Sequence, residues 1–167
     1  MMQGNIIGYE INEKTCQISF YNDQQLEPET LESESDNYQI PLIIGKLRDT
    51  WAYGKEAKRL VSISEGFTVT RLLERSLAGE KVEFGEDTYD AVWLLSKFIQ
   101  MSLQTFPKID GIVFTVPELT EELAKLLRGI AVRMNIDKQH IFIQDYKEGN
   151  FHGYKEGFAT DNLYELD

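Results

Sequence analysis

Residues that could cross-link this chain covalently or through a metal ion are scarce. The sequence has one cysteine, Cys16, and two histidines, His140 and His152. A single cysteine cannot form an internal disulfide, and neither histidine has a cysteine or the other histidine at the spacing of a metal site. We therefore expect no metal site of this kind. We interpret Cys16 as a small buried side chain in a strand.

Long apolar runs and an excess of positive charge are also missing. No apolar run approaches the roughly 18 residues that a membrane-spanning helix needs, and the first residues lack the basic and then apolar pattern of a signal peptide. The 28 acidic residues outnumber the 17 basic ones, which gives a net charge of −11. Such a charge repels nucleic-acid phosphates and anionic lipid headgroups. We expect a cytoplasmic protein without a nucleic-acid or membrane partner.

The first part of the chain has the pattern of a β-hairpin followed by shorter elements. Residues 5–11 and 16–21 are rich in β-branched and aromatic side chains, with a polar turn at 12–15 between them. Residues 22–37 contain acidic but no basic residues, and we expect a mobile, solvated loop there. Strands are predicted at 38–44 and 51–53, and short helices at 56–60 and 69–77.

The second part of the chain predicts a strand–helix–strand unit. Apolar residues at helical spacing predict a long helix with Asp87 as its N-cap and Phe106 near its end. Residues 111–116 form an apolar run without alternation, which is typical of a central parallel strand. Thr120 is the predicted N-cap of the next helix and Asn135 its end, and a strand follows at 141–143. The predicted fold class is α/β, a mixed sheet of antiparallel hairpin strands and then a βαβ unit, flanked by helices.

Four segments, in this order, are similar to segments of Hsp70-type proteins. Residues 8–14 and 16–20, Gly-Tyr-Glu-Ile-Asn-Glu-Lys and Cys-Gln-Ile-Ser-Phe, resemble the first phosphate-binding hairpin of that family. Residues 40–45 and 53–59 resemble a later strand and the segment after it, and residues 113–117, Val-Phe-Thr-Val-Pro, resemble a further strand. The chain thus resembles the N-terminal, ribonuclease-H-like half (subdomain I) of the actin-like ATPase superfamily, which includes actin, Hsp70 and sugar kinases. By this resemblance, residues 1–153 form that domain, and residues 154–167 are an irregular tail that could begin a missing second half.

The resemblance implies a nucleotide site with ATP and Mg²⁺ as cofactors. It places phosphate-binding residues at Glu10, Asn12, Glu13 and Lys14, and candidate catalytic carboxylates at Glu10 and Asp145. The family has Asp, Gly and two Thr at the four hairpin positions, so this chain departs from the pattern at each of them. The Glu13 carboxylate would repel phosphates, and Lys14 would offset this repulsion in part. We expect a divergent nucleotide-binding half that cannot hydrolyse ATP by itself and that pairs with a second half or a protein partner.

Two other functions fit the same topology. One is a non-catalytic protein-interaction or regulatory module on the actin-like scaffold, in which tail residues such as Phe151 and Tyr154 would cover a partner. The other, more remote, is a ribonuclease-H-like nuclease that would hold metal ions with Glu10, Glu118 and Asp145. A nuclease needs a basic track for its substrate, and a net charge of −11 argues against one.

Overall fold

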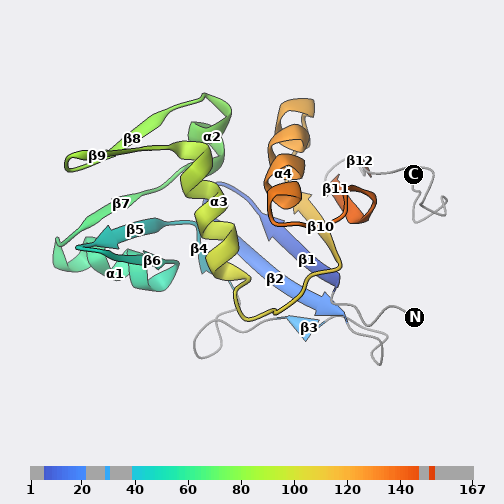
Figure 1. Cartoon of the computed structure of the whole chain (residues 1–167), viewed down its shortest axis with the longest axis horizontal. Helices are drawn as coiled ribbons and strands as arrows, with labels where there is room; N and C mark the ends of the chain where they lie inside the picture. The colour runs from blue at the N-terminus through green and yellow to red at the C-terminus, as the bar shows by residue number, and fades with distance from the viewer. Residues whose placement is uncertain (1–5, 22–28, 31–38, 147–150, 153–167) are drawn as a thin grey trace. The chain divides into compact units, whose positions relative to one another are not determined.

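The computed structural model describes residues 6–21, 29–30, 39–146 and 151–152 (Figure 1). The chain forms two compact units. Unit 1 comprises Met1–Ile11, Gln17–Tyr38 and Phe106–Asp167, and unit 2 comprises Asn12–Cys16 and Gln39–Thr105. Most of the expected acidic loop at 22–37 and all of the expected tail at 154–167 lie outside the described residues. The described part of the chain contains no helix that is long and apolar enough to cross a membrane.

Unit 1 is built on a mixed sheet. Its strands are β1 (Ile6–Ile11), β2 (Thr15–Tyr21), β3 (Glu29–Thr30), β10 (Gly111–Val116), β11 (Ile141–Asp145) and β12 (Phe151–His152), in the order β12-β11-β10-β1-β2-β3. Strand β10 pairs in parallel with β1 on one side and with β11 on the other, whereas β3 and β12 run antiparallel to their neighbours. A short strand of unit 2, β4 (Ile40–Pro41), pairs with Thr15 and Cys16, the first residues of β2, which also belong to unit 2. The predicted hairpin and the predicted central parallel strand are both confirmed.

The register of the parallel strands separates a buried face of this sheet from a less buried one. Tyr9 pairs with Phe114, and Phe114 pairs with Ile143. All three side chains have no exposed surface, and the Tyr9 and Phe114 ring centroids lie 5.7 Å apart. Because successive side chains of a strand point to opposite faces, the next residue of each strand belongs to the less buried face. Polar residues occupy that second face at the carboxyl ends of the strands.

Helix α4 (Glu121–Arg133) packs against β11 of this sheet (Figure 1). It begins where the sequence predicts, because Thr120 Oγ1 accepts a hydrogen bond from the backbone N–H of Leu123 at 3.1 Å. Such a cap contributes about 1 kcal/mol. The helix ends before Asn135, whose φ of 69° takes the backbone into the left-handed region. Its buried residues are Leu123, Ala124, Leu127, Ile130 and Ala131.

Unit 2 has three layers. The middle layer is a sheet in the order β6 (Thr50–Tyr53), β5 (Ile44–Leu47), β7 (Phe67–Val69). Helix α1 (Lys55–Ile63) packs on one face, where Leu60 lies against Gly45. The other face carries helix α3 (Ala91–Ser102) and the hairpin of β8 (Lys81–Phe84) and β9 (Asp87–Asp90), whose aromatic side chains contact those of the sheet. Helix α2 (Leu72–Leu77) packs against α3.

The long helix predicted from Asp87 to Phe106 is shorter than expected. Asp87 is not its N-cap, because residues 87–90 form strand β9, and α3 runs from Ala91 to Ser102 with Asp90 at the N-cap position. The turn at Gly85, whose φ is 68°, lets β8 fold back onto β9, and packing of Phe84 against Phe67 and Trp51 holds the hairpin there. Asp87 interrupts the alternation of apolar and polar residues along this hairpin, so the sequence does not indicate a strand there.

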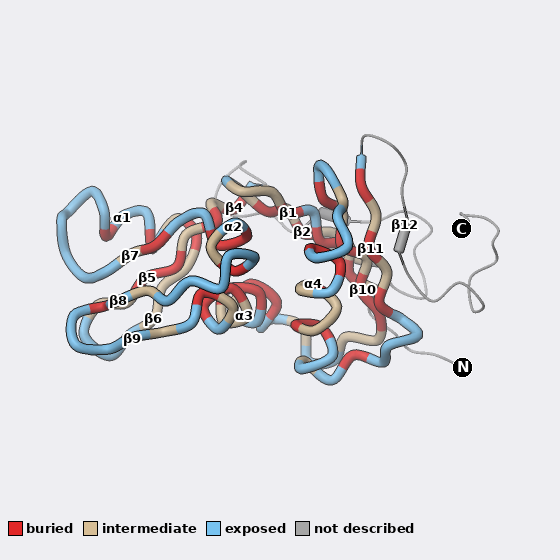
Figure 2. Tube along the Cα trace, turned by 90° about the horizontal axis from the view of Figure 1, so that it is seen from above, coloured by how far each residue is buried: buried red, intermediate tan, exposed pale blue. Residues whose placement is uncertain are grey.

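Two predictions between residues 54 and 77 also need correction. The helix predicted at 69–77 is wrong at its start, because Phe67–Val69 is strand β7 and α2 begins only at Leu72, after Arg71 with a φ of 56°. The helix predicted at 56–60 exists but extends to Ile63. Figure 2 shows that the chain from the end of α1 into β7 is exposed throughout residues 61–67. The strand predicted at 51–53 is confirmed as part of β6.

A methyl group at position 45 should destabilise unit 2. A Cβ on Gly45 would lie 2.7 Å from the carbonyl oxygen of Phe67 and 3.3 Å from a methyl group of Leu60, so β7 or α1 would have to shift. We expect Gly45→Ala to lower the free energy of unfolding in urea by about 1–3 kcal/mol. The control is Gly129→Ala in α4, where the nearest atom would lie at 3.5 Å, and here we expect a gain of about 0.5–1 kcal/mol. Changes of the same sign in both variants would contradict this packing argument.

Candidate functional site

The turn between β1 and β2 is held by the side chain of Asn12. Its Oδ1 accepts hydrogen bonds from the backbone N–H groups of Lys14, at 2.8 Å, and Thr15, at 2.9 Å. The backbone N–H of Asn12 donates to the carbonyl oxygen of Thr15 at 3.0 Å. Asparagine stabilises turns in this way because its side chain reaches the backbone two or three residues ahead. Two amide donors of the expected phosphate-binding turn are therefore engaged within the turn itself.

Glu13, at the tip of this turn, is bound to the beginning of α2. Its Oε1 accepts a hydrogen bond from the backbone N–H of Glu74 at 2.8 Å, and its Oε2 accepts one from Leu73 at 3.2 Å. The residue at the N-cap position of α2, Arg71, provides no side-chain cap of its own. A carboxylate is favoured there because the first N–H groups of a helix lack partners and carry a partial positive charge. Glu13 thus caps α2 from a position about 60 residues away in the sequence.

Lys14, the other charged residue of the turn, is exposed. Its carbonyl oxygen accepts a hydrogen bond from the backbone N–H of Leu42 at 2.9 Å, which ties the turn to the segment after β4. Of the four expected phosphate-binding residues, Glu10 belongs to unit 1, whereas Asn12, Glu13 and Lys14 belong to unit 2.

Glu10 belongs to a set of polar side chains at the carboxyl ends of three parallel strands of unit 1. Glu10 pairs in register with Thr115, and Thr115 pairs with Gln144. Gln144 Nε2 donates a hydrogen bond to Thr115 Oγ1 at 3.2 Å, and the hydroxyl of Tyr146 donates one to Glu10 Oε1 at 2.8 Å. We call Glu10, Thr115, Gln144 and Tyr146 the polar cluster. The carboxyl ends of parallel strands are where α/β proteins bind ligands.

The hydroxyl of Tyr146 stays protonated at neutral pH. Tyr146 as a whole is 54% exposed, but partial burial of its hydroxyl, together with the hydrogen bond to the Glu10 carboxylate, raises the pKa of Tyr146 to about 12. The tyrosine is therefore a hydrogen-bond donor to Glu10. The sequence alone identifies Glu10 but not its three neighbours in the cluster, since neighbouring strands must be aligned in register before Thr115 and Gln144 can be recognised as its neighbours.

Asp145 lies on the opposite, buried face of the same sheet. It pairs in register with Val116, and its Oδ2 accepts a hydrogen bond from the backbone N–H of Leu119 at 3.1 Å. The Asp145 carboxylate therefore holds the turn that follows β10, and its side chain is only 6% exposed. Glu10 and Asp145 are the two candidate catalytic residues, and the structure does not bring them together.

The three carboxylates considered for a nuclease do not form a metal site either. Glu10 and Asp145 point to opposite faces of the sheet, and Glu118 is exposed in the turn after β10. Within the described residues, no three His, Cys, Asp or Glu side chains are grouped so that they could hold a metal ion. Cys16 is buried, as expected for a strand residue without a reactive role.

The importance of Glu13 for the packing of α2 can be measured by substitution. We expect Glu13→Ala to lower the free energy of unfolding by about 1 kcal/mol, because two N–H groups of α2 lose their acceptors. Glu13→Gln retains one acceptor oxygen and should lose less. Urea denaturation of the three proteins gives these values. Lys14→Ala serves as the control at the adjacent exposed position, and a loss as large as that of Glu13→Ala would contradict a specific role for the carboxylate.

The same residue should give a small pH dependence of stability. Burial raises the pKa of Glu13 above its ordinary 4.5, and the hydrogen bonds from Glu74 and Leu73 oppose this effect only in part. The folded state then binds the proton more tightly than the unfolded state, so stability should fall as the pH rises through the interval just above 4.5 and level off above it. The comparison is between the urea unfolding curves of the natural protein and of Glu13→Gln across this interval. Parallel pH profiles for the two proteins would refute the prediction.

Comparison with known proteins provides a family but no activity. Residues 27–154 match the model of a family of unknown function, described as DUF5716 C-terminal. No curated protein matches the chain.

Proposed function

The chain belongs to the DUF5716 C-terminal family, and we propose that it is a non-catalytic protein-interaction module on an actin-like, ribonuclease-H-like scaffold. The scaffold part of the proposal is supported by the topology of unit 1. A hairpin, β1 and β2, comes first in the chain, and β1 then pairs in parallel with β10 of the later β10–α4–β11 unit. Two of the four segments that resemble Hsp70-type proteins fall on this framework, with residues 8–14 in β1 and its turn and residues 113–117 in β10 and just after it. The other two, residues 40–45 and 53–59, lie in unit 2.

The non-catalytic part rests above all on Glu13. In the family that the hairpin resembles, this turn brings backbone amides and hydroxyl groups to the nucleotide phosphates. In this chain a carboxylate occupies the turn and is bound to the N–H groups of Leu73 and Glu74. The N–H groups of Lys14 and Thr15 are bound to Asn12. A phosphate approaching the turn would meet a negative charge and amide donors that already have acceptors.

A second candidate function is nucleotide binding together with a second half of the fold. The polar cluster favours it, because Glu10, Thr115 and Gln144 lie at the carboxyl ends of parallel strands. The exposed Lys14 could supply a positive charge for a phosphate. In this alternative Mg²⁺ and ATP would be the ligands.

A direct titration separates the two candidates. We expect calorimetric titration of the chain with Mg²⁺ and ATP to give no saturable heat, and the midpoint of thermal unfolding to stay unchanged in excess nucleotide. A ligand at 100 times its Kd would stabilise the folded protein by about 2.7 kcal/mol, which a thermal melt detects easily. Saturable binding at micromolar concentrations that Lys14→Ala abolishes would overturn the non-catalytic proposal in favour of the nucleotide-binding one.

A further inference from the structure

A connected group of aromatic rings lies between the sheet, the β8–β9 hairpin and α3 of unit 2. Lys46 of β5 pairs in register with Trp51 of β6 on one side and with Phe67 of β7 on the other. These three residues therefore share one face of the sheet. Phe84 and Tyr89 extend from the hairpin toward this face, and Trp93 extends from the first turn of α3. We call Trp51, Phe67, Phe84, Tyr89 and Trp93 the aromatic surface.

The inner rings of the aromatic surface hold the hairpin in place. Phe84, only 4% exposed, stacks on Phe67 with ring centroids 5.6 Å apart, and it also contacts Trp51 at 6.2 Å and Tyr89 at 5.6 Å. Trp93 stacks on Tyr89 with centroids 5.2 Å apart and an interplanar angle of 20°. Offset aromatic pairs of this kind stabilise packing beyond the area they bury. This accounts for the buried part of the surface.

Packing within unit 2 does not explain why two rings of the aromatic surface, those of Phe67 and Trp93, are exposed. Phe67 remains 46% exposed and Trp93 45% exposed, although tryptophan is among the side chains that bury the most area. Trp and Tyr side chains dominate binding energy in protein interfaces because they present a large, rigid area at a low entropy cost. An exposed tryptophan that is held in place by a stacked tyrosine is already ordered for such a contact.

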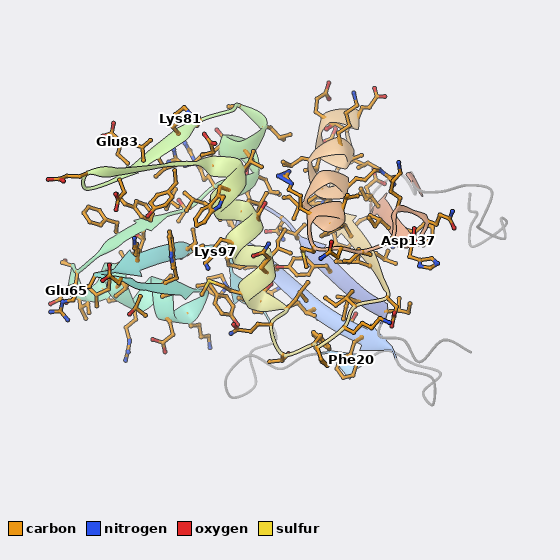
Figure 3. All side chains as sticks on the ribbon, viewed as in Figure 1. Phe20, Glu65, Lys81, Glu83, Lys97 and Asp137 are labelled. Atoms are coloured by element: carbon orange, nitrogen blue, oxygen red, sulfur yellow. The ribbon has the colours of Figure 1, made fainter. Side chains whose placement is uncertain are left out.

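Two lysines lie at the aromatic surface, and of these two, within the described residues, only Lys97 has a charge that no carboxylate balances. Lys46 Nζ donates a hydrogen bond to the Tyr89 hydroxyl at 3.0 Å and lies 3.9 Å from Asp87, so this charge is balanced inside unit 2. Lys97 follows Trp93 by one turn of α3, and its Nζ lies 5.9 Å from the centre of the Trp51 ring. Within the described residues Lys97 has no ion pair. Figure 3 shows Lys97 on α3, and Lys81 and Glu83 on the hairpin away from it.

The charge of unit 2 determines which kind of anion can approach. Unit 2 contains ten basic and ten acidic residues, so the whole negative excess of the chain lies in the residues of unit 1. A short segment with a few carboxylates interacts mainly with charges within a Debye length of about 8 Å, where Lys97 attracts it. A long polyanion such as a nucleic acid interacts with the net charge of −11 of the entire chain.

We propose that the aromatic surface binds an acidic segment of a partner protein, which places an apolar side chain on Trp93 and a carboxylate on Lys97. This proposal rests on the proposed function as a protein-interaction module and specifies the chemistry of the partner. The exposed rings supply the apolar contact, and Lys97 supplies the preference for an acidic segment over a neutral one.

The experiment is a titration monitored by tryptophan fluorescence. Trp51 and Trp93 are the two tryptophans of the chain, and both belong to the aromatic surface. The probe is a short blocked peptide of Glu, Phe, Leu and Gly, and the matched probe has Gln in place of every Glu. We expect saturable quenching by the acidic peptide, weakening with added salt, and about tenfold weaker binding of the Gln peptide.

Variants of the full chain locate the binding site. Trp93→Ala should weaken binding of the acidic peptide by about tenfold or more, with Trp51 remaining as the reporter. Lys97→Gln should weaken it several-fold and remove most of its salt dependence. Leu77→Ala is the matched control, because Leu77 is also 46% exposed in unit 2 but has no ring contact, and it should bind normally. Trp93→Phe, which keeps a ring for the hairpin, should be intermediate and remain folded by circular dichroism.

Three outcomes would overturn the proposal. They are equal binding of the acidic and Gln peptides, unchanged binding by folded Trp93→Ala or Trp93→Phe, and displacement of the peptide by oligothymidine, which would identify a nucleic-acid surface. These outcomes are separate from the test of the proposed function. Saturable binding of Mg²⁺ and ATP overturns the non-catalytic role whatever the peptide does, whereas failure of peptide binding without nucleotide binding removes only this surface.

Discussion

The parallel pairing of β10 with β1 and β11 is the constraint on which unit 1 depends. Its register places Tyr9, Phe114 and Ile143 in one buried row and Glu10, Thr115 and Gln144 in the row on the opposite face. A slip of one residue would exchange the two faces and bury a carboxylate in place of an aromatic ring. The buried row therefore determines on which face Glu10, Thr115 and Gln144 of the polar cluster lie. It also places Glu10 and Asp145 on opposite faces of the sheet.

Carboxylates of this chain perform a task that a bound anion performs in other proteins. Glu13 accepts hydrogen bonds from the first N–H groups of α2, and Asp145 accepts one from the turn after β10. Backbone N–H groups at such positions attract phosphates for the same electrostatic reason that they attract these side chains. Because the anions are supplied by the chain itself, the hairpin and the turn are held in place without a ligand.

The two units differ in charge. Unit 2 has equal numbers of basic and acidic residues, whereas the residues of unit 1 carry the negative excess. Exposed large apolar side chains occur in both units, for example Trp93 in unit 2 and Val132 in unit 1. The interaction that we propose needs apolar contact area and a local charge that selects the partner. In unit 2 these are combined where Trp93 and Lys97 lie one turn apart on α3. The fold that a sequence resembles and the surface that it uses are thus separate questions.

The sequence by itself determined the elements whose signals are local. The hairpin of β1 and β2, the central strand β10 and helix α4, with its cap at Thr120 and its stop at Asn135, follow from residue type and periodicity over a few neighbouring residues. Only the tertiary structure decided the roles of Glu13 and Tyr146, because their partners are 60 or more residues away. It also decided the β8–β9 hairpin, where packing of Phe84 against Phe67 and Trp51 prevailed over an apparent helix start at Asp87. Local propensities differ by about 1 kcal/mol or less per residue, whereas buried aromatic contacts contribute more, so long-range packing decides wherever the two conflict.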